Sequence, residues 1–253
     1  MTAQTAYGVV LALSTALVAG VVGSFALMKR MTLAGDVVSH LALPGLGLAF
    51  LWHLNPLLGG AVTLAIGIVI IDRLQRRTGL ATETAIGVVF VAGLAIGTLV
   101  TPREDLIDAL FGGFAPLSPL MLTVGLAGCI AVASTIFILR DRLILIIFSP
   151  DVAKSLSIDV ERVNFIYLCM FGATILLGLQ HLGALLAGAM IIVPAAIGRQ
   201  FAKTLDQFLI ISAVAAMMAV GIGFAIALRS ALPPGPVIVA VASVMFAASL
   251  FRR

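Results

Sequence analysis

The stretch most suggestive of chemistry is residues 35–47, Gly-Asp-Val-Val-Ser-His-Leu-Ala-Leu-Pro-Gly-Leu-Gly. Asp36 and His40 are four residues apart, so in a helix both side chains lie on one face. A carboxylate with an imidazole suits zinc, manganese or ferrous iron, whereas calcium prefers oxygen ligands and copper(I) prefers sulfur. The pair is therefore a candidate metal site. The structural alternative is that Asp36 is a negative charge near the helix N-terminus, where the helix dipole favours it, and that it pairs with Lys29 or Arg30.

Pro44 follows His40 by four residues and lacks the amide proton that would normally bond the His40 carbonyl oxygen. We therefore expect a kink here and a His40 carbonyl oxygen that is free to face a polar path. Unpaired backbone inside a bilayer is tolerated where it lines a cavity or is buried in protein.

Three further residues are weaker candidates for metal ligands. His181 follows Gln180 in a predicted outer turn, where it is either an entrance ligand or an ordinary hydrogen-bonded interfacial residue; His53 is a weaker candidate again. Glu83 follows Thr82 at the start of an apolar segment, so a capped helix start is favoured there, with a gate or exit ligand as the alternative.

A short helix is predicted from Ser149-Pro150-Asp151 onward, because serine suits the cap and proline the first helical position. It falls within 140–162, the longest connection that we expect on the cytoplasmic side. A helix outside the membrane offers a surface for a cytoplasmic partner; an ordinary surface helix is the alternative.

Composition decides what kind of protein holds these residues. Of 253 residues, 62% are hydrophobic and 10% charged, and the mean hydropathy is +1.22, whereas soluble domains have roughly 25% charged residues. At about 20 apolar residues per bilayer crossing, the chain has room for eight or nine helices and no separate soluble domain. We predict an all-α, polytopic transmembrane bundle forming one domain over 1–253.

Nine crossings are predicted, and eight remain open because the break between the sixth and seventh rests on Gln180, His181 and Gly183. The apolar segments are 7–28, 36–53, 56–72, 83–100, 118–139, 162–180, 183–198, 207–228 and 236–251.

Basic residues lie in clusters between these segments, so the net charge of +4 reflects membrane topology rather than nucleic-acid binding. With alternating loops, 13 of the 15 lysines and arginines fall on one side, and only Arg103 and Arg229 on the other. Because basic loops stay in the cytoplasm, we predict an external N-terminus and a cytoplasmic C-terminus of a multi-pass protein in the cell membrane.

No G-x-x-x-x-G-K-[ST] phosphate loop is present in the sequence, and no Ser-His-Asp or paired-carboxylate arrangement suggests hydrolysis. We therefore expect no enzyme and no bound cofactor; energy from ATP would need a separate subunit.

Taken together, the motifs resemble the permease family of zinc, manganese and iron ABC importers, in the family's order from residue 25 to about 250. The matching stretches are Gly35-Asp36, Ser39-His40, Pro44-Gly45, Glu83-Thr84-Ala85-Ile86-Gly87, Leu110-Phe111-Gly112, Phe148 with Pro150 and Ala153, Gly183 with Leu185-Leu186, Ile192 with Pro194-Ala195-Ala196, and Pro234-Gly235-Pro236.

This resemblance implies a type II importer architecture, with two permease copies, a cytoplasmic ATP-binding subunit and an extracytoplasmic metal-binding protein. It implies that Asp36 and His40 lie on the path of a transported divalent ion. It also implies contact with the ATPase through residues 149–158, in particular Ser149, Pro150, Asp151, Ala153, Lys154 and Ser155. The alternatives are a secondary metal carrier or channel without ATPase, and an ABC permease for siderophore-like or cobalamin-like cargo.

Overall fold

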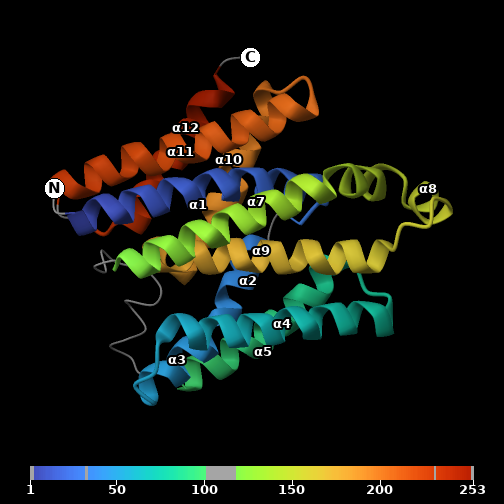
Figure 1. The fold of residues 1–253 in the computed structure, drawn as a ribbon, viewed down its shortest axis with the longest axis horizontal. Coiled ribbons are helices and arrows are strands. Elements are labelled where there is room, and N and C mark those ends of the chain that lie inside the picture. The colour runs from blue at the N-terminus through green and yellow to red at the C-terminus, as the bar shows by residue number, and fades with distance from the viewer. Residues whose placement is uncertain (1–2, 32–33, 101–117, 231, 252–253) are drawn as a thin grey trace.

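A computed structural model describes residues 3–31, 34–100, 118–230 and 232–251, and every regular element in these ranges is helical, as predicted (Figure 1). In chain order the elements are α1 (Ala3–Met28), α2 (Ala34–Ser39), the 3₁₀ turn η1 (His40–Ala42), α3 (Leu43–Leu51), α4 (Pro56–Thr78), α5 (Thr82–Val100), α7 (Pro119–Phe148), α8 (Pro150–Ser155), α9 (Val160–Leu182), α10 (Ala184–Phe201), α11 (Leu205–Ser230) and α12 (Pro234–Leu250).

The long helices are stacked in layers (Figure 1). Helices α11 and α12 form one side, α1, α7 and α9 the middle, and α3, α4 and α5 the other side, while α2 lies between α9 and α4. Helix α1 contributes to both hydrophobic clusters, one shared with α7 and α9 and the other with α10, α11 and α12. The outer layers are therefore joined through α1, α2, α9 and α10.

The membrane-spanning segments agree with the sequence. Seven helices of the described part are long and apolar enough to cross a bilayer, and two shorter apolar helices cover Ala187–Phe201 and Pro234–Leu250. Together they coincide with the nine apolar segments predicted from the sequence. The break between the sixth and seventh lies at Gly183, whose φ of 73° is a conformation that glycine adopts readily.

Two helices continue beyond the apolar runs that predicted them. Helix α7 extends to Phe148 instead of ending near residue 139, and α4 extends to Thr78, where Gly79 adopts a left-handed conformation. A charged residue ends an apolar run without ending a helix. Arg140 lies within α7 and pairs with Asp206 at the start of α11, so the predicted connection 140–162 is helical in its first part.

Glycines allow several helices to approach to backbone contact, as the small-residue pattern predicts for membrane helices. A Cβ atom at Gly23 would lie 1.9 Å from the carbonyl oxygen of Ile191 on α10. One at Gly45 on α3 would lie 2.0 Å from the carbonyl oxygen of Gly59 on α4. These pairs fix the separation of their helices.

Candidate metal centre and cytoplasmic surface

The second membrane span is interrupted directly after Ser39, where α2 gives way to η1 and then to α3. The interruption at this point was expected from Pro44. The expectation of a free His40 carbonyl oxygen is wrong, because it accepts a hydrogen bond from the Leu43 amide. In a 3₁₀ turn the carbonyl oxygen of a residue accepts from the amide three residues later instead of four. The His40 oxygen therefore bonds the Leu43 amide and does not need the amide proton that Pro44 lacks.

Helix α2 lies deep in the bundle, about halfway along the neighbouring α9 ribbon (Figure 1). It packs against α5, α9 and α10. Its contact with α10 is through backbone: a Cβ atom at Gly188 would lie only 2.2 Å from the amide nitrogen of Asp36, and one at Gly35 would lie 3.0 Å from the Gly188 carbonyl oxygen. Gly188 therefore sets the position of the Asp36 backbone.

Asp36 and His40 face each other, with His40 Nε2 at 3.9 Å from Asp36 Oδ1. That separation is too long for a hydrogen bond. Two metal bonds of about 2.1 Å at a tetrahedral angle would place the donor atoms about 3.4 Å apart, so a small side-chain rotation would let both atoms reach one cation. Sequence spacing thus identified a pair that the fold does bring together.

The surroundings of His40 are apolar. The residue is 8% exposed, its ring centroid lies 5.6 Å from that of Phe90 on α5, and its Nδ1 atom is buried without a hydrogen-bond partner in the described structure. Buried histidines that serve only packing are usually hydrogen-bonded, because an unpaired polar atom away from water is costly. The Asp36 side chain remains 55% exposed in the single chain.

The alternative role for Asp36 was an ion pair with Lys29 or Arg30. Neither pair is formed in the described part of the chain. The Lys29 ammonium instead donates to Asn164 Oδ1 and lies 5.0 Å from the centre of the Tyr167 ring. Burial without a carboxylate partner lowers the pKa of Lys29, just outside the first span, to about 8.

Of the weaker candidates, Glu83 and His53 do not join this pair. Glu83 is exposed in the first turn of α5, seven residues before Phe90, which corresponds to about 10 Å of helix. Thr82 is itself the first helical residue there and does not cap through its side chain. His53 is exposed in the turn after α3, and the His181 side chain lies outside the described residues. In the described part of the chain no third histidine, cysteine or carboxylate completes a metal cluster.

Helix α8 projects from one end of the bundle between α7 and α9 (Figure 1). The short helix expected from Ser149 onward is present, although the Ser149 side chain makes no capping hydrogen bond. Ala153 is fully buried, whereas Phe148, Val152 and Leu156 are 75%, 46% and 62% exposed. Val152 and Leu156 lie one helical turn apart at α8, and Phe148 lies just before it at the end of α7; these three exposed side chains are called the apolar stripe of the projecting segment.

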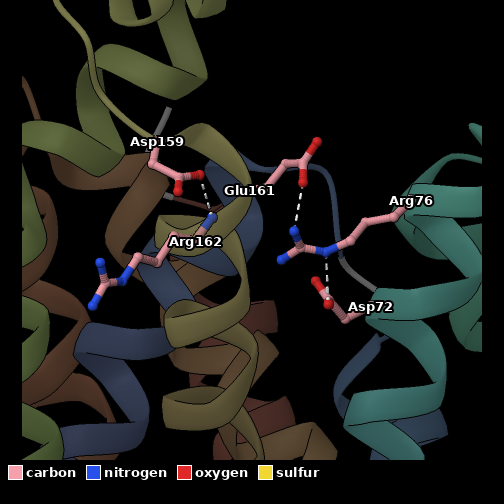
Figure 2. Close-up of polar contacts among 5 residues, drawn as sticks. All are labelled: Asp72, Arg76, Asp159, Glu161 and Arg162. Carbon is pink, nitrogen blue, oxygen red and sulfur yellow. Dashed lines mark hydrogen bonds and ion pairs between the residues drawn. The ribbon is translucent and has the colours of Figure 1, made fainter.

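A set of ion pairs joins α4 to the first turn of α9 (Figure 2). Arg76 donates to Asp72 on its own helix at 2.8 Å and to Glu161 on α9 at 2.5 Å. Asp159 caps α9 by accepting from the Arg162 amide at 2.9 Å. The Asp72 to Arg76 spacing was readable from the sequence, but no local pattern could link Arg76 with Glu161, 85 residues away.

The layered helical bundle and the pairing of a buried His40 with Asp36 in a broken span define a polytopic membrane protein with a candidate ion site. The chain belongs to the ABC 3 transport family, whose sequence profile matches residues 2–253. This confirms the family resemblance that the motifs indicated.

Relatives with descriptive names match nearly the whole chain. The manganese import system permease protein ScaB of Streptococcus parasanguinis is 28% identical over 95% of this chain and 87% of its own length. The high-affinity zinc uptake system membrane protein ZnuB of Haemophilus influenzae is 28% identical over 97% and 95%. The solved structure of PsaBC from Streptococcus pneumoniae in complex with Fab superposes with a TM-score of 0.86 at 25% identity, covering 100% of this chain and 92% of that one.

Proposed function

We propose that this chain is the membrane-spanning permease subunit of an ATP-driven importer of divalent transition-metal ions: zinc, manganese or ferrous iron. The observation that carries the proposal is the buried His40, whose Nδ1 has no hydrogen-bond partner in the described structure and whose Nε2 faces Asp36 inside a membrane span. Ionisable groups at bilayer depth usually mark ion paths. Family membership and the metals named for ScaB and ZnuB point the same way.

One chain supplies two ligands, which is fewer than the four of a typical zinc site. A second copy facing the first across the path would supply another carboxylate and another imidazole. Two carboxylates would neutralise one divalent cation, so its binding would offset the cost of holding Asp36 at this depth. The exposed flank of Asp36 in the single chain is the surface that the second copy would approach.

The apolar stripe of Phe148, Val152 and Leu156 is proposed to dock a cytoplasmic ATP-binding subunit. The residues placed at or beside this contact are Ser149, Pro150, Asp151, Ala153, Lys154 and Ser155. The clustering of basic residues supports a cytoplasmic location of α8, with the N-terminus outside and the C-terminus inside. An extracytoplasmic metal-binding protein would deliver the ion to the opposite end.

Movement of α8 has a direct route to the metal-bearing half of the chain. Helix α9 follows α8, and Glu161 in its first turn binds Arg76 of α4. Helix α4 packs against α3, α5 and η1, which includes His40. ATP-driven displacement of α8 would thereby shift the helices around the ion, as alternating access requires.

The test is uptake of radiolabelled zinc or manganese by vesicles that contain the reconstituted complex, with and without ATP. Uptake should require ATP and should be lost in Asp36→Ala, while Asp141→Asn, an exposed aspartate within α7, should transport normally. ATP-independent uptake would exclude the importer mechanism. Unchanged uptake by correctly inserted Asp36→Ala would exclude this carboxylate as a ligand.

A further inference from the structure

A cavity of about 340 Å³ lies at the α8 end of the bundle, away from the Asp36–His40 pair. It is formed where α1 and α7 end and where α5 and α9 begin. Its polar lining residues are Lys29, Arg30, Thr82 and Asn164, and its apolar lining residues are Met28, Ile146 and Ile147. One side of the cavity can therefore hold a charged group and the other a hydrocarbon group.

The charged side is positive and lacks a counter-ion in the described structure. No carboxylate lines the cavity. Lys29 is partly buried, and within the described residues its ammonium contacts the neutral Asn164 side chain and the Tyr167 ring. Arg30 is exposed, and its side chain has no hydrogen bond or ion pair in the described part of the chain. A bound anion would supply the compensation that Lys29 lacks.

The start of α5 adds to this preference for an anion. Thr82 opens a 19-residue helix at the cavity wall, so the positive end of the helix dipole lies beside the two cations. Glu83 follows Thr82, but it is not among the residues that line the cavity. Its side chain is exposed.

The position of the cavity restricts what the anion can be. It lies where the apolar helices α1 and α7 end and α5 and α9 begin, and the ends of membrane-spanning helices are expected to meet lipid headgroups. A small hydrated ion would make no contact that requires the apolar wall. Basic pockets between helices on the cytoplasmic side are a known form of anionic lipid site.

We propose that this cavity binds an anionic phospholipid of the cytoplasmic leaflet, with the phosphate between Lys29 and Arg30 and an acyl chain along Ile146 and Ile147. The lipid would brace the junction of α1, α5, α7 and α9 beside the segment that leads into α8. The choice of the cytoplasmic leaflet rests on the orientation given in the proposed function. The preference for an anionic lipid is independent of that orientation.

The experiment is thermal unfolding of the purified full-length permease in detergent, titrated separately with dioleoyl phosphatidylglycerol, dioleoyl phosphatidylcholine and inorganic phosphate. Phosphatidylglycerol should raise the melting temperature of the wild type more than phosphatidylcholine does. Arg30→Gln should weaken the apparent affinity for phosphatidylglycerol about fivefold, as expected for one basic contact at a membrane surface. Arg162→Gln removes an exposed charge near the start of α9, outside the cavity lining, and should leave the affinity unchanged.

Equal losses in Arg30→Gln and Arg162→Gln would show a general surface-charge effect and overturn the site. An equal shift with inorganic phosphate would overturn the assignment to lipid. Lys29→Met should reproduce the Arg30→Gln effect; if it does not fold, Arg30→Gln decides alone, because the Arg30 side chain makes no hydrogen bond or ion pair in the described chain. Since the readout is unfolding rather than uptake, a negative result leaves metal import untouched, and a negative Asp36→Ala result leaves the lipid site untouched.

Discussion

The deep α2 region and the α8 end of the bundle differ in how their ionisable side chains are paired and how far they are exposed to water. At α2, Asp36 and His40 face each other without a hydrogen bond and with apolar neighbours such as Phe90. At the α8 end, Arg76 binds two carboxylates at once in exposed surroundings. Water makes the second arrangement inexpensive and of little consequence for stability. Within membrane spans, ionisable side chains usually mark ion paths or sites where they are paired.

Loss of the imidazole should have the largest effect of any change in either region. His40→Ala removes one of the two proposed ligands and should reduce metal uptake by roughly 100-fold or more, since even the residues that hydrogen-bond to metal ligands contribute about 10- to 100-fold to metal affinity. Uptake of radiolabelled ion by vesicles measures this. His53→Ala, at an exposed turn, is the matched control and should behave as wild type. Equal uptake by both variants would place the ion path elsewhere.

A charge on the projecting helix should have the next largest effect. Val152→Glu places a carboxylate in the apolar stripe, and its desolvation on docking should reduce copurification of the ATP-binding subunit about tenfold or more. Leu54→Glu makes the same kind of change at the exposed turn between α3 and α4 and should leave copurification intact. If Val152→Glu retained the subunit fully, α8 would not be its docking surface.

A methyl group at Gly188 should have an intermediate effect. Gly188→Ala forces the Asp36 backbone away from α10, which should lower stability by about 1–3 kcal/mol and reduce uptake severalfold. Gly87→Ala, on a helix face with no atom within 4 Å, should be neutral or stabilising. Melting temperature and uptake are measured on both variants. Normal uptake in Gly188→Ala would mean that the carboxylate position is not critical.

The exposed ion pairs should give the smallest effect. Arg76→Gln should lower the melting temperature by roughly 2 °C or less, because exposed pairs contribute little. The difference from wild type should vanish in about 1 M salt, where charges are screened within about 3 Å. Arg73→Gln, an exposed neighbour without an ion pair in the described structure, is the control. A large, salt-independent loss would show that Arg76 acts through packing instead.

The fold was largely predictable because a bilayer leaves few choices. Backbone groups in hydrocarbon must be paired within the chain, so long apolar runs become helices. The ends of helices were less predictable, as α7 shows, because Arg140 interrupts the apolar run while the backbone continues the helix to Phe148.

The site was predictable only where its contacts are local. The Asp36 to His40 spacing is one helical turn and can be read directly. Phe90 and Gly188 reach this pair from distant parts of the chain, and no sequence periodicity relates them to it. The His40 carbonyl was misjudged because a missing amide in the chain does not reveal which neighbouring amide will replace it.

Gly188 also distinguishes the two proposed ligands, Asp36 and His40, in a way that bears on how such proteins diversify. Asp36 lies where the backbones of α2 and α10 are in contact, so a larger residue at Gly188 would move the carboxylate. The imidazole is bordered instead by the Phe90 side chain on α5, a contact between side chains rather than between backbones. Descendants of one ancestral chain could thus come to favour different ions by altering residue 90 and its surroundings, while the anchor on α10 stayed the same.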